Sequence, residues 1–275
     1  MKKYILYLLL GCIFSNFSFA QKDTALNNAY FKLEKTIAGD FNYFNVDVLE
    51  NIYVITSGNQ LQKISSNGDS LASYGNVKKY GNPAYIDVSN PLKILVYYKT
   101  YSTIVTLDRL LTFINSINLR SLQLFNVNAI STSYDNNIWL FDESNFKIKK
   151  INENGNILSE GQDMRMVVDE VPAPTQILEA NNQVLLYDEN KGFFIFDFYG
   201  AYKNVIPFLH WKNVAIGNRI IYGFDESKLY KYELNSLNLK EYLLPAVFTD
   251  YKSIKALNGK LYLLKKNGIE IYHID

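Results

Sequence analysis

The chain has 275 residues, with 28 lysines and arginines against 27 aspartates and glutamates, and a formal net charge of +1. This balance, without a basic run, excludes the phosphate-neutralising surface on which nucleic acid binding depends. The single cysteine, Cys12, excludes an intramolecular disulfide. The 22 tyrosines and 17 phenylalanines, together with abundant isoleucine, valine and threonine, favour β-strands.

The first 20 residues have the pattern of a secretory signal peptide. Lys2 and Lys3 precede an apolar run over residues 4–11, and Ser18 and Ala20 are the small residues of a cleavage site after Ala20. The run is shorter than the roughly 20 apolar residues of a membrane span, so we expect no span. The predicted protein is exported and lies in the periplasm, at the outer membrane or outside the cell.

A lipoprotein signal is the alternative interpretation. It would end at Leu9-Leu10-Gly11-Cys12 and leave Cys12 lipidated. Two apolar residues, Ile13 and Phe14, follow the cysteine, where lipoproteins of this kind usually turn polar. We therefore favour cleavage after Ala20, which leaves residues 21–275 without cysteine.

Six later segments share one form, a turn followed by a β-rich run. Counted from the first aliphatic residue of each run, they recur every 36 to 46 residues. The runs are Asn51–Val54, Lys93–Val96, Asn137–Leu140, Gln183–Leu186, Arg219–Tyr222 and Lys260–Leu263. This period suits one four-stranded propeller blade per repeat.

Individual strands can be placed within a repeat. In the third repeat we expect strands A to D at Asn128–Tyr134, Ile138–Asp142, Phe146–Asn152 and from Ile157 onward. Asn154-Gly155 separates the last two strands, and Asn67-Gly68 has the same place in the first repeat. Asn-Gly is a strong hairpin signal because both residues accept positive φ.

The two ends of the sequence together supply the four strands of the sixth repeat. The sixth repeat supplies Tyr251–Leu257, Lys260–Lys265 and Ile269–Ile274, and then stops one strand short. The run Tyr30–Gly39 is a strand without a repeat, so we expect it to complete blade six and close the ring. The sequence thus predicts an all-β, six-bladed β-propeller in one domain over residues 21–275. The predicted blades span about 40–80, 81–124, 125–170, 171–208, 209–247, and 248–275 plus 29–39.

The segment Phe44–Gly75, "FNVDVLENIYVITSGNQLQKISSNGDSLASYG", resembles an NHL-type blade. Such blades have an apolar-Asp inner strand, an "NIYV" second strand and a third strand that ends at Asn-Gly. The resemblance implies a six-bladed propeller and implies no activity, because propellers host enzymes, receptors and scaffolds alike.

An acidic pair recurs at the predicted B–C hairpins of blades three, four and five. The pairs are Asp142-Glu143, Asp188-Glu189 and Asp225-Glu226. One interpretation is an acidic rim that docks a partner. The other is turn chemistry, in which the aspartate bonds its own backbone and the glutamate faces water. Separate blades lie about 10 Å apart, too far for two pairs to share one calcium ion.

The two histidines, and aromatic residues near the predicted starts of inner strands, are the other candidates. Two distant histidines, His210 and His273, fall short of the three protein ligands typical of catalytic zinc, so we predict no metal and no cofactor. Aromatic anchors suit binding interfaces, although most aromatics in a β-rich chain pack between sheets. The candidate binding residues are Tyr43, Tyr85, Phe125, His210, Trp211 and Tyr251.

Two further features bear on function. The predicted inner strands carry polar residues that could line a channel, namely Asp47, Asp87, Asn128, Glu179 and Lys255. The longest interblade segment, Gly161–Pro174, is either a binding loop or a strand extension that packs on blade four.

These features predict an exported, monomeric, non-catalytic propeller that binds a protein partner in the cell envelope, or a glycan, or acts as a scaffold in an envelope assembly. The alternative is a propeller hydrolase or lyase with a metal in the central channel.

Overall fold

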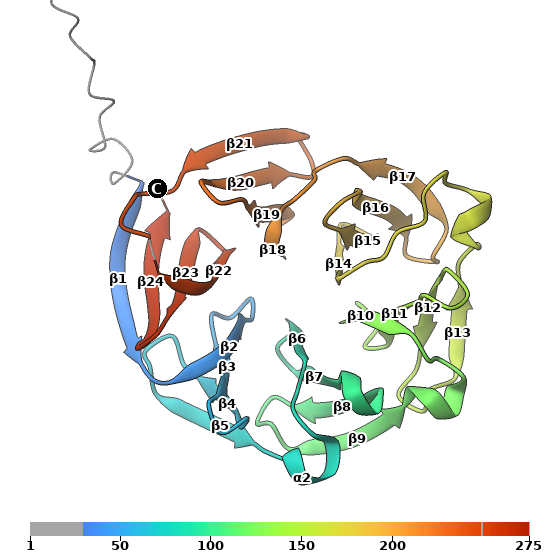
Figure 1. Ribbon diagram of the computed structural model, residues 1–275, viewed down its shortest axis with the longest axis horizontal. Helices are drawn as coiled ribbons and strands as arrows, with labels where there is room; N and C mark the ends of the chain where they lie inside the picture. Colours follow the sequence, from blue (N-terminus) through green and yellow to red (C-terminus); the bar gives the residue numbers. More distant parts are fainter. Residues whose placement is uncertain (1–29, 249, 275) are drawn as a thin grey trace, which may run out of the picture.

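The computed structural model describes residues 30–248 and 250–274. Six four-stranded antiparallel sheets surround a central axis, which confirms the predicted six-bladed propeller (Figure 1). The expected signal peptide and Cys12 lie outside the described residues. Within those two ranges, no helix has the length and apolar character needed to cross a membrane.

Each of the first five blades is a meander whose strands follow chain order from the axis outward. Blade one contains β2 (Phe41–Val46), β3 (Ile52–Thr56), β4 (Leu61–Ile64) and β5 (Ser70–Tyr74). Blade two contains β6 (Tyr85–Asn90), β7 (Lys93–Tyr98), β8 (Thr103–Asp108) and β9 (Phe113–Asn118). Blade three contains β10 (Val127–Thr132), β11 (Ile138–Asp142), β12 (Lys147–Ile151) and β13 (Ile157–Glu160).

The remaining strands complete the ring. Blade four contains β14 (Gln176–Ala180), β15 (Gln183–Asp188), β16 (Gly192–Asp197) and β17 (Tyr202–Ile206). Blade five contains β18 (Lys212–Gly217), β19 (Ile220–Phe224), β20 (Lys228–Glu233) and β21 (Asn238–Leu243). Blade six contains β22 (Tyr251–Leu257), β23 (Lys260–Lys265), β24 (Gly268–Ile274) and β1 (Phe31–Ala38). Short helical segments α2 (Val77–Tyr80), η1 (Lys99–Tyr101), η2 (Leu119–Leu122) and η3 (Met164–Met166) lie in the connections.

The hydrophobic core is divided among the six blade interfaces. Each of six buried clusters joins residues of two neighbouring blades. Second strands such as β3 and β11 are buried along most or all of their length, because neighbouring blades cover both of their faces. Outermost strands such as β13 are mainly exposed. The β-rich runs detected in the sequence are therefore the second strands, whose burial demands continuous apolar residues.

The predicted closure through the N-terminal strand is confirmed. β1 pairs with β24 in antiparallel register from Phe31 opposite Ile274 to Ala38 opposite Gly268. Gly268 has a φ of 143°, and a Cβ there would lie 2.0 Å from the carbonyl oxygen of Ile37. This position therefore requires glycine, because the incoming strand passes directly against its backbone.

The predicted Asn-Gly hairpins form, but with a different turn. Gly68 and Gly155 adopt positive φ values of 92° and 84°. Asn67 and Asn154, which precede them, are not among the described residues that have positive φ. The register shifts by one residue beside each turn, between Lys63 and Ile64 and between Lys150 and Ile151. Only the glycine thus needs positive φ, as in a turn followed by a glycine bulge rather than a two-residue mirror-image turn.

Candidate functional site

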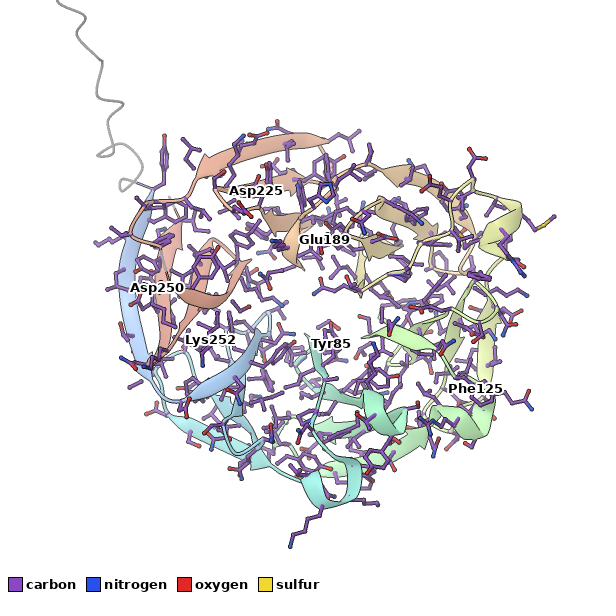
Figure 2. The ribbon with its side chains drawn as sticks, viewed as in Figure 1. Tyr85, Phe125, Glu189, Asp225, Asp250 and Lys252 are labelled. Carbon is purple, nitrogen blue, oxygen red and sulfur yellow. The ribbon has the colours of Figure 1, made fainter. Side chains whose placement is uncertain are left out.

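One face of the ring carries the B–C hairpins and the D–A connections, and we call it the hairpin face. Two backbone hydrogen bonds join these elements: the His210 N–H donates to the Glu189 carbonyl (2.6 Å), and the Glu143 N–H donates to the Asn126 carbonyl (2.9 Å). Figure 2 labels Glu189, Asp225 and Phe125 in this region. The sequence candidates at these connections therefore lie on a common side of the molecule.

The aspartate of each acidic pair forms its own turn. One carboxylate oxygen accepts the backbone N–H two residues later, from Ser144 to Asp142 (3.1 Å), from Asn190 to Asp188 (2.9 Å) and from Ser227 to Asp225 (2.8 Å). This is the hydrogen bond by which aspartate stabilises turns. The recurrence of the aspartate thus has a structural cause in all three blades.

Asp142 and Asp188 do not belong to the expected acidic rim. Asp142 is fully buried, and its Oδ2 accepts from Asn145 Nδ2 (2.7 Å) and lies 2.9 Å from Lys149 Nζ. Burial alone would raise the pKa of Asp142, but these hydrogen bonds and the lysine charge outweigh it and lower the pKa. Asp188 is also buried, and its Oδ2 accepts the Ala173 N–H (2.8 Å).

The third pair contributes to an open pocket between blades four and five. The cavity has a volume of about 470 Å³, and its lining consists of Glu189, His210, Lys212, Asp225, Glu226 and Ser227. We call it the acidic pocket, since three carboxylates face one lysine. Asp225 Oδ2 accepts the Tyr230 hydroxyl (2.5 Å). Burial would raise the pKa of Asp225, but that bond and the N–H groups of residues 227 and 228 lower it. The pocket is suited to a cationic group.

Trp211 is a core residue rather than the expected surface anchor. Its ring is 5% exposed and stacks between Phe208 (centroids 4.5 Å apart) and Tyr230 (4.9 Å). Its carbonyl accepts the Tyr187 hydroxyl (2.7 Å). His210, just before it, is exposed with a φ of 62°. The chain therefore turns inward at this connection and places Trp211 under the acidic pocket.

The other predicted residues are dispersed. Phe125 is 60% exposed, Tyr251 is partly buried against the cluster between blades five and six, and His273 on β24 has Nδ1 3.6 Å from Glu34 Oε1. Tyr43 and Tyr85 line the central channel, and burial raises the pKa of both phenols. The expected aromatic centre on one face is thus replaced by residues in the core, in the channel and at separate surface positions.

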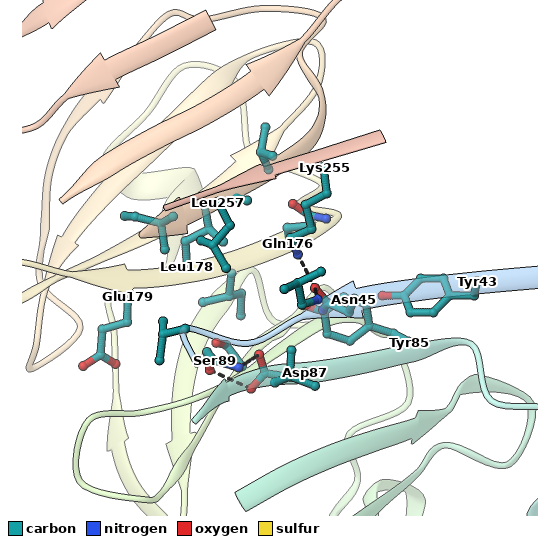
Figure 3. A pocket seen from close by; sticks show the side chains of 18 residues that line it. Tyr43, Asn45, Tyr85, Asp87, Ser89, Gln176, Leu178, Glu179, Lys255 and Leu257 are labelled. Atoms are coloured by element: carbon teal, nitrogen blue, oxygen red, sulfur yellow. Dashed lines mark hydrogen bonds between the residues drawn. The ribbon is translucent and has the colours of Figure 1, made fainter. Parts of the chain in front are cut away.

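The central channel is narrow and bridged by hydrogen bonds between blades (Figure 3). Lys255 of blade six donates to Asn45 Oδ1 of blade one, and Asn45 Nδ2 donates to the Ile86 carbonyl of blade two (2.8 Å). Asp87 Oδ2 then accepts the N–H and the hydroxyl of Thr132 in blade three (2.7 Å each). The cavity in the channel is about 70 Å³, whereas small-molecule sites are about 300–1,000 Å³.

The polar residues predicted on inner strands mostly serve the structure. Burial lowers the pKa of Lys255 to about 8, and the negative charge of Asp87 offsets part of this shift. Glu179 accepts the Trp139 indole N–H (2.7 Å) and the Tyr134 N–H (3.1 Å), and burial raises its pKa. Asp47 accepts the N–H groups of residues 49 and 51 in its own turn. Among the described residues, no three His, Cys, Asp or Glu side chains gather closely enough to hold a metal ion.

Part of the segment Gly161–Pro174 packs against blade four, as expected for a strand extension rather than a binding loop. Met164 is fully buried in the cluster between blades three and four, and Val167, Val168 and Val171 pack against that cluster. Met166, in contrast, is 82% exposed. The segment is therefore anchored to the core and presents the large apolar side chain of Met166 to solvent.

No family model matches the chain, and no curated protein is similar to it in sequence. Among solved structures, a streptogramin B lyase aligns with a TM-score of 0.60 at 15% identity, over 90% of this chain and 88% of that chain. A catalytically inactive variant of virginiamycin B lyase from Staphylococcus aureus, with quinupristin, aligns with a TM-score of 0.58 at 16% identity, over 89% of each chain.

The extracellular domain of a hybrid two-component system from B. thetaiotaomicron aligns with a TM-score of 0.55 at 12% identity, over 86% of this chain and 34% of that chain. A lyase and a domain of a two-component system thus share this architecture with the present chain. At such identities the likeness shows the β-propeller fold and nothing more specific.

Proposed function

We propose that this protein is an exported, non-catalytic binding propeller that engages a protein partner of the cell envelope through the hairpin face. The observation that carries the proposal is the acidic pocket. It is open, it is lined by charged residues of two adjacent blades, and its carboxylates exceed its cations. The partner group that fits it is an exposed lysine or arginine side chain.

The hairpin face around the pocket supports a macromolecular partner. Phe125 and Met166 project from D–A connections with 60% and 82% of their surfaces exposed. Single exposed apolar residues on the same face as a charged pocket match the mixture of anchors and polar contacts found at transient interfaces. A rigid scaffold that holds such connections in place is a common arrangement for recognition.

The alternative function, a hydrolase or lyase with a metal in the central channel, has less support. Three channel side chains that could bind or activate a substrate, Asn45, Asp87 and Lys255, are engaged in hydrogen bonds between blades. The lyases that align with this chain share its fold at 15–16% identity. An enzyme that used these three side chains would need the inter-blade bonds to open.

Site-specific photocrosslinking in intact cells tests the proposal. A photoreactive residue in place of Ser227, in the acidic pocket, should give a discrete crosslinked partner. The same residue in place of Asn154, an exposed position on the opposite face, is the matched control. Replacing Glu189 and Glu226 by glutamine should slow association about tenfold at low salt, because rim charges act mainly on encounter rate. Crosslinking only from position 154, or no effect of the charge removal, would contradict the proposal.

A further inference from the structure

Three turns of blades three and four lie on the face opposite the hairpin face, and two of them expose a cluster of aromatic rings. Tyr134 lies in the A–B turn of blade three, and Phe198 and Tyr199 lie in the C–D turn of blade four. The Tyr134 and Phe198 centroids are 6.2 Å apart, and those of Phe198 and Tyr199 are 4.0 Å apart. Tyr134 and Tyr199 are 67% and 69% exposed. Turn tips are usually polar, so this cluster calls for a functional explanation.

The Tyr134 ring is held in place by its surroundings. Its backbone N–H donates to Glu179 Oε1 (3.1 Å), and Lys150 Nζ lies 5.2 Å from the ring centroid. Lys150 is itself fixed by Asp135, with Nζ 3.1 Å from Oδ2. A tyrosine that is already ordered gives up little conformational entropy on binding.

The turn that carries Tyr199 is also rigid. Asp197 Oδ1 accepts the N–H groups of Tyr199 (3.0 Å) and Ala201 (2.9 Å). Lys203 Nζ lies 2.9 Å from Asp197 Oδ2. Two aromatic platforms on neighbouring blades are therefore preorganised next to each other.

The polar groups around the rings favour a neutral ligand. Asp135 is paired with Lys150 and Asp197 with Lys203. The nearby Glu179 carboxyl is held by the Tyr134 and Trp139 N–H groups, and burial raises its pKa, which disfavours its charged form. The A–B turn of blade four adds the exposed amides of Asn181 and Asn182, whereas the Asn136 amide oxygen accepts from Asn90 Nδ2 of blade two (2.7 Å). Aromatic faces carry partial negative charge and attract polarised C–H groups, and amides both donate to and accept from hydroxyls. A pyranose ring offers both kinds of group.

We propose that these three turns form a binding site for a neutral glycan, in which Tyr134 and Tyr199 stack on sugar rings and the asparagine amides bind their hydroxyls. The site is separate from the acidic pocket and lies on the other face. The propeller would thus bind a carbohydrate with one face while its hairpin face remains free.

Affinity electrophoresis of the whole protein through gels that contain soluble neutral polysaccharides tests the site. The probes are dextran, laminarin, xyloglucan and galactomannan, with hyaluronan as an anionic comparison. We expect retardation by at least one neutral polymer. Tyr199→Ala and Tyr134→Ala should each weaken it at least tenfold, whereas Tyr199→Phe, which keeps the ring, should stay within threefold.

Leu237→Ala is the matched control, because Leu237 is 70% exposed on the same face but lies in blade five. It should leave retardation unchanged, and thermal unfolding of every variant should match that of the original protein. Absence of retardation by all four neutral polymers, equal retardation of Tyr199→Ala, or salt-sensitive retardation by hyaluronan alone would each overturn the proposal.

Discussion

The same tetrapeptide, Phe-Asp-Glu-Ser, has different surroundings in blades three and five. At 141–144 the aspartate is fully buried beside Lys149 of strand β12. At 224–227 it is partly exposed, bonds the Tyr230 hydroxyl of strand β20 and lines the acidic pocket. The adjacent strand thus decides the role of the motif: a lysine neutralises the carboxylate, whereas a tyrosine leaves its charge available. A repeated motif marks a repeated turn, and its chemistry has to be sought in the neighbouring strand.

The largest effect on stability is expected from Trp211→Ala, which removes the ring that supports the Phe-Asp-Glu-Ser copy in blade five. Trp211→Ala deletes a ring that stacks on Tyr230, the partner of Asp225. Burial at 5% exposure predicts a loss of about 3–5 kcal/mol in unfolding free energy. Urea denaturation measures it. A loss below about 1 kcal/mol would show that Trp211 is a surface residue after all, as its position in the sequence had suggested.

The paired substitutions Asp142→Asn and Asp225→Asn compare the two copies directly. At position 142 an amide nitrogen would face Lys149 or Asn145, both of which donate, so we expect a loss of about 2 kcal/mol. Lys149 keeps a second partner in Glu160 at 3.2 Å, which limits the cost. At position 225 the tyrosine hydroxyl can rotate and accept from the amide, so we expect a loss of less than about 1 kcal/mol. Equal losses in urea denaturation would remove the distinction between the copies.

The smallest expected effect is the pH dependence of the stability that the buried Asp142 provides. The folded-state pKa of Asp142 lies below its ordinary value of 3.8, so the ionised carboxylate stabilises the fold above that value. The stability advantage over Asp142→Asn should therefore hold from pH 7 to about pH 5 and shrink as the pH falls below 3.8. Urea denaturation of both proteins at several pH values provides the comparison. An advantage that grows on acidification would mean that the carboxyl is protonated in the fold.

The strands were predictable because their burial leaves a local pattern. The expected Ile138–Asp142 and Lys260–Lys265 coincide with β11 and β23, and the spare N-terminal run is β1. Continuous apolar residues and turn dipeptides encode these elements within a few positions of sequence. Ring closure could be inferred because a missing strand and a spare strand left one simple solution.

The candidate site was less predictable because contacts between blades leave no local pattern. That Trp211 points inward depends on Phe208 and Tyr230, and that Asp142 is neutralised depends on a lysine in the next strand. The aromatic cluster of Tyr134, Phe198 and Tyr199 was missed, although the sequence contains a signal: a Phe-Tyr-Gly turn where polar residues are usual. Its partner Tyr134 comes from another blade and becomes apparent only in three dimensions.

The pairing of β1 with β24 determines how the ring responds to mechanical force. Phe31 lies opposite Ile274, so the first residue of β1 and the last residue of β24 lie at the same end of the hydrogen-bonded ladder. Tension applied at Phe31 and Ile274 would load that first pair alone and open the ladder one pair at a time toward Ala38 and Gly268. Resistance to shear, in which all the hydrogen bonds share the load, is not available in this geometry. Blade six would therefore unzip under a pull at Phe31 and Ile274 more readily than under a load shared by all its hydrogen bonds.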